Sequence, residues 1–490
     1  MEKTVVLYPG LAVSHFVPMM QLAAQLPEHG YAVSVALIDP GVMEDIVFSA
    51  VVAHVAASMP SVTFHTLPAV EDPPKLTLDI QFIPRYLDLL RRYNERLRDF
   101  LSSMRPHAMV VDSMSSEAVV VAKRLGIPCY NLLTSSASIL AAFSQLPMLL
   151  PLPHGGASFG ELGDSPLELF GLPPMPASHL LAEMLEDPDS ETYKATMGSL
   201  CWMMEGNGTL VNTFESLEAR GVAALRDPRC VPGRVLPPVY CVGPFVGGGA
   251  ITEAKEWHEC LVWLDGQPDR SVVFLCFGSI GAESHSKEQL REIAVGLENS
   301  GHRFLWVVRA PVDDTKKPFD PSAGPALDAL LPEGFMERTS GRGLVVKLWA
   351  PQLDVLRHAA TGAFVTHCGW NSVLESVTAG VPMLCWPLYA EQKMNKLFMV
   401  EDMGIAVEMI GWQQGLVKAD ELEGKVRLVM ESEEGRELRM CVEAHKEGAP
   451  VARNDGGSSR LAFAQFLADV ASLQDRAHTG VGISMGLSDA

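Results

Sequence analysis

Apolar runs that alternate with amphipathic helical stretches constrain the fold of this chain most strongly. Helical patterns such as residues 18–26 and 86–104 separate several of these runs. Strands that alternate with helices in this way predict parallel sheets joined by right-handed crossovers. The predicted strands are 4–8, 32–37, 62–66, 108–112, 128–133 and 209–213 in the first half and 271–277, 303–308, 343–348, 362–366 and 381–385 in the second.

The two halves meet at a glycine-rich stretch, GPFVGGGA, at residues 243–250. Such a composition is typical of a linker, and 490 residues are enough for two domains of ordinary size. We therefore expect an α/β protein with two doubly wound, Rossmann-like domains that face each other across a cleft. The expected segments are a first domain at 1–242, a linker at 243–255, a second domain at 256–457, a final helix at 458–473 and a flexible tail at 474–490.

Composition and charge exclude several classes of function. An apolar content of 48% and a charged content of 20% are those of a globular protein outside the membrane. The formal net charge of −21 argues against nucleic acid or an anionic membrane as a partner. The nine cysteines contain no CxxC pair, so we expect buried thiols in a reducing compartment. The N-terminus runs into a strand without the basic region and cleavage site of a signal peptide, which predicts a cytoplasmic protein.

One uncharged stretch, residues 125–160, could form either a membrane-spanning helix or the lining of an apolar pocket. A membrane-spanning helix needs about 20 apolar residues without breaks, whereas serines and prolines interrupt this stretch repeatedly. We interpret it as a buried strand, a short helix and an apolar loop. Its large side chains are suited to lining an apolar pocket, and they include Phe143, Leu146, Met148 and Leu149.

The segment 363–379 combines a short apolar strand, a turn containing Gly369 and a helix. We expect the helix to cover 373–379, with Asn371 or Ser372 as its N-cap. Free backbone N–H groups and the positive end of the helix dipole would make the turn a phosphate site. Glu375, about one turn inside the helix, can reach the two hydroxyls of a ribose. The same strand, turn and helix occur in many βα units, so this pattern alone leaves a purely structural role open.

The wider segment 349–392 is much more specific. It begins WAPQ, carries HCGWNS at 367–372 and ends in Glu391 and Gln392. In these motifs and their spacing it closely resembles the signature segment of the plant family 1 UDP-sugar glycosyltransferases, which make glycosides of secondary metabolites. The length of the chain and the order of its elements also resemble that family. The resemblance implies the GT-B architecture, in which the last helix crosses back onto the N-terminal domain.

Two polar residues at predicted strand ends are candidates for catalysis. His15 lies in the predicted loop after the first strand, and Asp112 ends the strand 108–112. Ligands of open parallel sheets bind beyond the carboxyl ends of the strands, so both residues should lie at one rim. An imidazole can remove a hydroxyl proton at neutral pH, and a carboxylate behind it would orient the ring. The resemblance implies the same roles for His15 and Asp112.

The loop before His15 departs from the pattern of the family. Many relatives have glycine immediately before the catalytic histidine, whereas this chain has Ser14, preceded by Leu11, Ala12 and Val13. The spacing from Pro9 to His15 is kept. We therefore retain the assignment of His15 and expect an altered loop conformation.

The resemblance also assigns a donor pocket by position. Trp349 should stack on uracil, because a flat indole offers a large contact area at low entropic cost. Ala350 should offer backbone groups to the base edge, and Gln352 and Glu375 should hold the ribose hydroxyls. The phosphates should contact His367, Asn371, Ser372 and Ser279, and the sugar should contact Thr134, Trp370, Glu391 and Gln392.

Other uses of two doubly wound domains fit less well. A nicotinamide oxidoreductase would carry GxGxxG after its first strand, and a nucleoside-triphosphate enzyme would carry GxxxxGK[ST]; the sequence contains neither in that place. It also contains no HExxH motif or cluster of Cys and His, and the resembled family needs no metal because helix dipoles neutralise the diphosphate. A sugar-nucleotide-binding protein with little catalysis remains an alternative, although His15 and Asp112 argue against it.

The sequence therefore predicts an inverting glycosyltransferase with His15 as general base and no prosthetic group. The expected donor is UDP-glucose, since relatives with Gln at the position of Gln392 tend to use glucose. The expected acceptor is a small hydrophobic phenol such as a flavonoid, and a UDP-sugar transferase acting on a non-phenolic acceptor is the second alternative. We expect a monomer with no nucleic-acid partner and no membrane span.

Overall fold

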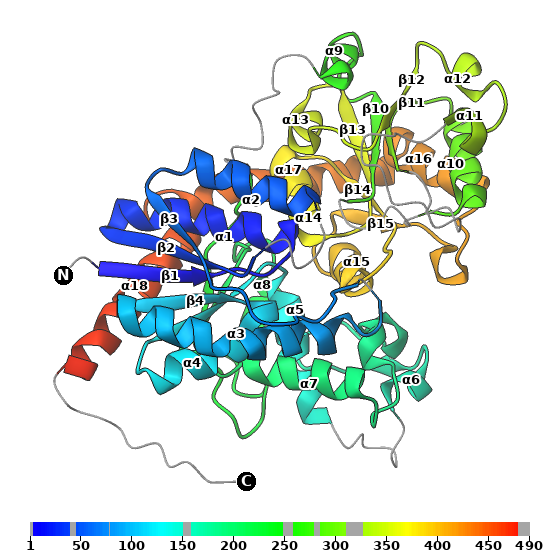
Figure 1. Cartoon of the computed structure of the whole chain (residues 1–490). Helices are drawn as coiled ribbons and strands as arrows, with labels where there is room; N and C mark the ends of the chain where they lie inside the picture. Colours follow the sequence, from blue (N-terminus) through cyan, green and yellow to red (C-terminus); the bar gives the residue numbers. More distant parts are fainter. Residues whose placement is uncertain are drawn as a thin grey trace.

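The computed structural model describes residues 3–39, 46–77, 79–149, 158–247, 258–278, 285–309 and 327–478. Its helices and strands form two lobes, each built on a parallel sheet (Figure 1). We call the part up to Gly247, together with the last helix, the first lobe, and residues 258–453 the second lobe. The predicted linker lies partly outside the described residues.

The first lobe contains a seven-stranded sheet in the order β3-β2-β1-β4-β5-β8-β9. Every pairing in it is parallel. Its central strands are buried on both faces, which explains their continuous apolar runs in the sequence. The strands are β1 (Lys3–Tyr8), β2 (Tyr31–Leu37), β3 (Val62–Thr66), β4 (Ala108–Asp112), β5 (Cys129–Leu133), β8 (Gly208–Val211) and β9 (Val239–Cys241).

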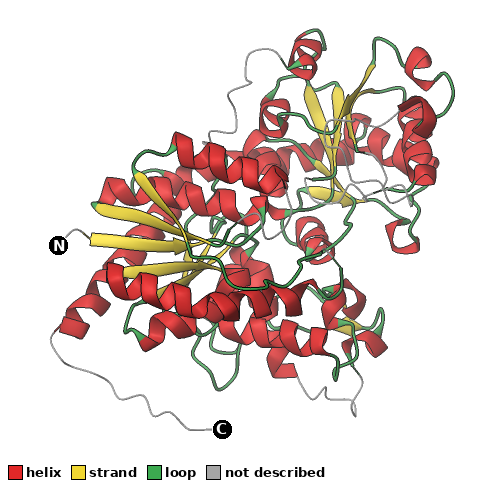
Figure 2. Ribbon diagram, viewed as in Figure 1, coloured by secondary structure: helices red, strands yellow, loops and turns green. Residues whose placement is uncertain are grey.

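Helices cover both faces of this sheet (Figure 2). The longest of them, α3 (Phe82–Met104), buries Tyr86, Leu90, Leu97 and Leu101 at helical spacing. The other helices are α1 (Val13–Gln25), α2 (Ile46–Ser58), α4 (Val119–Arg124), α5 (Ala137–Gln145), α6 (Phe159–Leu162), α7 (Glu191–Met203) and α8 (Ala219–Arg226). The short 3₁₀ turns are η1 (Leu26–His29), η3 (Ser113–Ala118), η4 (Leu146–Leu149), η5 (Ala177–His179) and η6 (Ala182–Met184). A small hairpin consists of β6 (Pro166–Leu167) and β7 (Met175–Pro176).

The second lobe contains a six-stranded parallel sheet in the order β12-β11-β10-β13-β14-β15. Its strands are β10 (Val272–Cys276), β11 (Arg303–Val308), β12 (Gly343–Lys347), β13 (Thr361–Thr366), β14 (Met383–Cys385) and β15 (Ala406–Glu408). Its helical elements are α9 (Glu259–Asp265), α10 (Lys287–Ser300), α11 (Leu327–Leu330), α12 (Phe335–Arg338), α13 (Gln352–Arg357), α14 (Trp370–Ala379), α15 (Gln392–Glu401), η8 (Trp412–Gln414), α16 (Ala419–Glu431) and α17 (Glu433–Arg453).

The last helix, α18 (Ser458–His478), returns to the first lobe (Figure 1). There it packs beside β9. Phe466 meets the ring of Tyr130 edge-on, with 4.9 Å between centroids, and the hydroxyl of Tyr240 donates to Asp469. The predicted helix end at residue 473 is too early. Gln474 Nε2 donates to the carbonyl of His107 at 2.6 Å, which ties the additional turn to the sheet.

Every predicted strand is present, but the sequence pattern missed β6, β7, β9 and β15. These strands have only two or three residues each, which is too short to show a period. Among the described residues, no helix combines the length and the apolar character that a membrane span requires.

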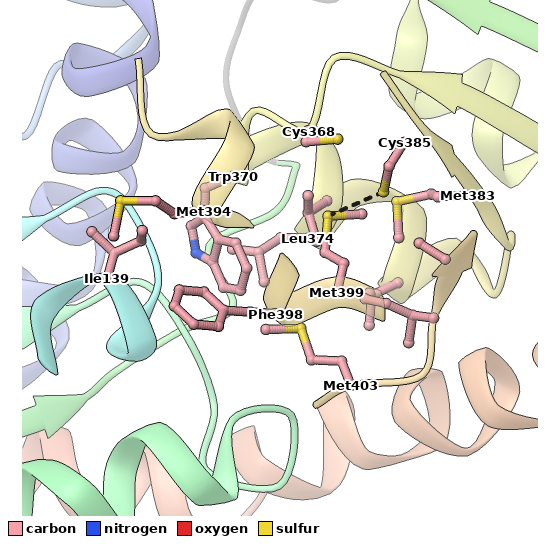
Figure 3. Packing of buried hydrophobic residues seen from close by; sticks show 14 of the residues in the cluster. Ile139, Cys368, Trp370, Leu374, Met383, Cys385, Met394, Phe398, Met399 and Met403 are labelled. Atoms are coloured by element: carbon pink, nitrogen blue, oxygen red, sulfur yellow. Dashed lines mark hydrogen bonds between the residues drawn. The ribbon is translucent and has the colours of Figure 1, made fainter. Parts of the chain in front are cut away.

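The two lobes share one continuous apolar cluster. Ile139 of α5 belongs to the same cluster as Trp370 of α14 and Met394 and Phe398 of α15, and Figure 3 shows these side chains close together at the junction. Helix α15 of the second lobe lies next to α5 of the first (Figure 1). Buried apolar area of this kind stabilises one relative placement of the lobes.

Candidate active site

His15 lies in the first turn of α1, and not in a loop as the sequence predicted. Helix α1 begins at Val13 after Ala12, whose side chain makes no cap hydrogen bond. The helical pattern at residues 18–26 led us to expect that the helix begins at Pro18. Instead Pro18 lies inside the helix, one turn beyond Ser14. The earlier start places His15 in the helix, where its ring contacts Asp112 and Thr134.

His15 and Asp112 form the pair that the sequence predicted. Both carboxylate oxygens of Asp112 lie 2.7 Å from His15 Nδ1. Strand β4 pairs with β1 in parallel, so the two residues meet at the carboxyl edge of the sheet. Asp112 is fully buried, whereas the His15 side chain is 25% exposed. A proton shared between Nδ1 and the carboxylate leaves Nε2 as the basic nitrogen.

Gly10 makes the close approach of Asp112 possible. A Cβ atom at Gly10 would lie 2.9 Å from Asp112 Oδ1 and 3.1 Å from its Cγ. A side chain there would force the carboxylate or its surroundings to shift, and so disturb its contact with His15. Local sequence does not indicate this contact, because it joins residues from two different strand ends.

The surroundings of His15 raise its pKa above the ordinary value. Burial alone lowers the pKa of the imidazole, because it disfavours the charged form. The charge and the hydrogen bond of Asp112, together with the charge of Glu391, outweigh burial and raise the pKa. Two carboxylates therefore favour the imidazolium that forms when this ring accepts a proton.

Two residues that the sequence did not indicate hold Glu391 near His15. Ser135 Oγ of the first lobe donates to Glu391 Oε1 at 3.0 Å. Asn395 Nδ2, one turn further along α15, lies 3.4 Å from the same oxygen. Thr134, the predicted sugar contact, lies beside them, with its Oγ1 3.2 Å from His15 Nδ1. The predicted residues Thr134 and Glu391 are therefore brought together with His15.

Helix α14 begins earlier than predicted. It starts at Trp370 with Gly369 as its N-cap and no side-chain cap, so neither Asn371 nor Ser372 is the cap. Both lie in the first turn, and their side chains bind elsewhere. Asn371 Nδ2 donates to the carbonyl of Ser14 at 2.9 Å. Ser372 Oγ accepts a hydrogen bond from Gln352 at 2.9 Å.

Gln352 also donates to Glu375, so the predicted ribose ligands meet. The distance from Gln352 Nε2 to Glu375 Oε2 is 2.7 Å. Burial raises the pKa of Glu375, and the hydrogen bond from Gln352 opposes that effect. Together with Ser372, these side chains form a compact polar group beside the N-terminus of α14, as a site for adjacent hydroxyls requires.

His367 is a buried, neutral imidazole at the end of β13. A Cβ atom at Gly278 or at Gly369 would lie 2.6 Å or 2.5 Å from His367 Nε2, so two glycines make room for the ring. Burial, assisted by the charge of Arg309, lowers the pKa of His367 to about 4. Its Nδ1 is buried and has no hydrogen-bond partner in the structure. Such an unpaired group beside a helix N-terminus suits an oxygen-rich ligand.

The predicted base-binding residues differ in exposure. The indole of Trp349 is 46% exposed, and the ring of His258 meets it edge-on at 5.6 Å. Ala350, the next residue, is buried. A large exposed aromatic face beside a buried main chain is the arrangement that a stacked base requires.

In two predicted sugar contacts, part of the side chain is already hydrogen-bonded within the protein. Trp370 is buried, and its indole N–H donates to the carbonyl of Asn212 at 2.7 Å. Any contact of Trp370 with a sugar would therefore come from its main chain. Gln392 Oε1 accepts from the backbone N–H groups of Leu388 and Tyr389 at 2.9 and 3.0 Å. The Gln392 side chain also hydrogen-bonds the side chain of Tyr389, so at most one N–H of its amide is left for a ligand.

Ser279, the remaining predicted residue, lies outside the described residues. Within the described part of the chain, no group of three or more His, Cys, Asp or Glu residues is arranged to hold a metal ion. Of the four apolar side chains expected to line a pocket, Leu146 is fully buried and Met148 is half exposed. Phe143 and Leu149 pack partly against the apolar cluster.

Comparison with known proteins decides the family. A family model described as UDP-glucoronosyl and UDP-glucosyl transferase matches residues 231–454. Anthocyanidin 5,3-O-glucosyltransferase of a Rosa hybrid cultivar is 38% identical over 482 residues, covering 94% of this chain and 98% of that protein. Phloretin 2'-O-glucosyltransferase of Malus domestica is 38% identical over 487 residues, covering 96% and 100%. This chain belongs to the UDP-glycosyltransferase family.

Solved structures of UDP-glycosyltransferases share its fold. Phytolacca americana UGT2, solved with UDP-2fluoro-glucose and pterostilbene, has a TM-score of 0.82 and 32% identity, covering 96% of this chain and 100% of that one. A UDP-glucosyltransferase from Polygonum tinctorium capable of glucosylating indoxyl has a TM-score of 0.83 and 33% identity, covering 96% and 99%. The predicted GT-B fold and the predicted class of enzyme are confirmed. The enzyme uses a UDP-sugar as donor substrate.

Proposed function

We propose that this UDP-glycosyltransferase moves glucose from UDP-glucose to a hydroxyl of a hydrophobic phenol, with inversion at the anomeric carbon. The observation that carries the proposal is the His15–Asp112 pair, in which both carboxylate oxygens lie 2.7 Å from Nδ1. This pair leaves a basic Nε2 on a partly exposed ring at the rim of the sheet. A protein that only bound sugar nucleotides would have no need of such a pair.

The proposed reaction follows from the charges at the site. His15 Nε2 takes the proton of the acceptor hydroxyl, and the oxygen forms a bond to the anomeric carbon from the side opposite UDP. The bond between that carbon and the diphosphate oxygen breaks, and the electron pair leaves with UDP. Asp112 and Glu391 stabilise the imidazolium that results, since both raise the pKa of His15.

The second lobe is proposed to hold UDP. The N-terminus of α14 would face the diphosphate, with the neutral His367 and Ser372 beside it. Gln352 and Glu375 would bind the ribose, and Trp349 would stack on uracil. Ser279 keeps its proposed phosphate role from the sequence. The division into an acceptor domain at 1–242 and a donor domain at 256–457 belongs to the same proposal, supported by the two separate sheets.

The proposed donor and acceptor rest on different observations. Ser135 and Asn395 fix Glu391 beside His15, which places a carboxylate for hydrogen bonds from sugar hydroxyls. Gln392 contributes at most one amide N–H, because its oxygen is already engaged and its side chain also hydrogen-bonds Tyr389. Similarity to proteins named as anthocyanidin and phloretin glucosyltransferases supports glucose as the donor sugar and a phenol as the acceptor. Phe143 and the half-exposed Met148 are proposed as apolar contacts for such an acceptor.

We further propose that the enzyme is a cytoplasmic monomer. All nine cysteines are free thiols, and most are buried, as expected in a reducing compartment. One chain supplies both the base and the proposed donor pocket, so the site does not require a second copy.

Competition among equimolar UDP-glucose, UDP-galactose and UDP-xylose tests the donor assignment. Each hydroxyl is read by a few hydrogen bonds of about 0.5–1.5 kcal/mol, so we expect glucoside as the main product, with a preference of roughly tenfold or less per contact. The assay uses a panel of phenols and non-phenolic alcohols with mass detection of the products. Galactoside or xyloside as the main product would contradict the role of Gln392, and exclusive use of non-phenolic alcohols would contradict the proposed acceptor.

A further inference from the structure

The N-terminus of α14 is joined to the first lobe by two consecutive side chains. Asn371 Nδ2 donates to the carbonyl of Ser14 at 2.9 Å, and Trp370 Nε1 donates to the carbonyl of Asn212 at 2.7 Å. Both bonds cross between the lobes and end on main-chain oxygens. The helix proposed to face the diphosphate is therefore connected to the backbone immediately before His15.

The carbonyl of Ser14 is available because of Pro18. In an α-helix the N–H of residue 18 bonds to the carbonyl of residue 14. Pro18 lies inside α1 and has no N–H, so it cannot make this bond. Main-chain carbonyls away from water require a donor, and Asn371 supplies one. The bond uses the main chain of Ser14, so it does not depend on the serine side chain that distinguishes this chain from its relatives.

The amide of Asn371 is oriented by this bond. Its Oδ1 is buried and has no hydrogen-bond partner in the structure. If the amide were reversed, its oxygen would face the carbonyl oxygen of Ser14, which is unfavourable. The amide group is therefore directed at the first lobe, while the backbone N–H groups at the start of α14 remain available for the diphosphate.

We propose that Asn371 is a positioning residue that fixes the catalytic base relative to the donor, and that Pro18 keeps the Ser14 carbonyl available for it. The inference rests on the proposed role of His15 as base. Ser14 directly precedes His15, and Asn371 lies in the first turn of α14. Their hydrogen bond thus sets the distance between the His15 ring and the leaving diphosphate, and transfer rates depend steeply on such distances.

The variant Pro18→Ala tests this proposal without touching a ligand. The introduced alanine would supply an N–H that holds the Ser14 carbonyl along the helix axis, away from Asn371. We expect kcat to fall about three- to tenfold, as the loss of one hydrogen bond predicts. The melting temperature should stay the same or rise, because alanine is the better residue inside a helix. A purely structural role of Pro18 would not lower kcat while stability rises.

The matched control is Pro450→Ala, since Pro450 also lies inside a helix, α17, and is exposed. This variant should keep the kcat of the parent. Asn371→Ala should lower kcat by an amount similar to Pro18→Ala, with the Kd for UDP unchanged by calorimetry. Asn371→Asp keeps the size of the side chain but turns an oxygen toward Ser14, so its kcat should be at least as low.

A double-mutant cycle completes the test. Pro18 and Asn371 act through one hydrogen bond. The kcat of the double alanine variant should therefore be no lower than that of the more impaired single variant. The proposal is overturned if Pro18→Ala has the kcat of the parent, or if Asn371→Ala weakens UDP binding at unchanged kcat, as a phosphate ligand would. Failure of the proposed function would look different, since His15→Ala would then keep its turnover.

Discussion

His15 and Asp112 are joined through a single ring nitrogen, with both carboxylate oxygens of Asp112 at 2.7 Å from Nδ1. The carboxylate is fully buried and the ring is partly exposed. The carboxylate therefore selects the tautomer with hydrogen on Nδ1 and leaves Nε2 as the basic nitrogen. The proposed chemistry depends on this relationship, and four predictions test it.

Asp112→Asn should remove most of the activity while leaving the shape of the site intact. The asparagine amide can donate to Nδ1, which would place the ring hydrogen on Nε2 and abolish its basicity. We expect kcat to fall by about 10²–10⁴-fold, as for an orienting carboxylate in a hydrolase triad. Steady-state kinetics with UDP-glucose and a phenol measure this. A kcat within about twofold of the parent would mean that Asp112 does not orient the base.

The pH dependence of kcat/KM should reveal the raised pKa of His15. The base must be neutral to accept a proton, so activity falls on the acid side with a midpoint above the ordinary value of 6.5. Glu391→Gln removes a negative charge that raises this pKa, so the acid limb should move to lower pH even if the rate is also reduced.

Glu401→Gln, at an exposed position on the same helix, is the control and should leave the limb in place. An acid limb that stays unchanged in Glu391→Gln would show that Glu391 does not act on the protonation of His15.

Gly10→Ala should displace Asp112 without unfolding the protein. The added Cβ would lie 2.9 Å from Asp112 Oδ1, so the carboxylate or its surroundings must shift. We expect kcat to fall by roughly tenfold or more, since the pair loses its hydrogen-bond geometry. Gly198→Ala in α7 is a matched control, because no neighbouring atom lies within 4 Å of its added Cβ. Equal kcat in the two variants would argue against the tight contact at Gly10.

The sequence predicted the strands and the meeting of His15 with Asp112, because parallel neighbouring strands place their carboxyl ends at one edge. It placed His15 in a loop, because the helical pattern was recognised only from Pro18 onward. In the structure Pro18 is tolerated inside α1, where the carbonyl that it leaves unpaired accepts from Asn371. A donor from a distant part of the chain cannot be found from local sequence.

The same limit applies to the contacts that refine the site. Gly10 matters only because Asp112 comes within reach of it, and Ser135 matters only because Glu391 of the other lobe lies opposite. The motif HCGWNS indicated a phosphate site, but only the structure assigns the Trp370 indole to Asn212 and the Asn371 amide to Ser14. The sequence of one lobe does not indicate which of its residues will contact the other lobe.

Turnover of His15→Ala, measured together with its affinity for UDP, tests whether His15 is the base. Loss of a general base typically costs about 10²–10⁴-fold in rate, and the proposed UDP pocket lies in the other lobe. We therefore predict that kcat for a phenol falls by at least about a hundredfold while the Kd for UDP, measured by calorimetry, stays that of the parent. Turnover near that of the parent, with UDP bound equally well, would contradict His15 as the base.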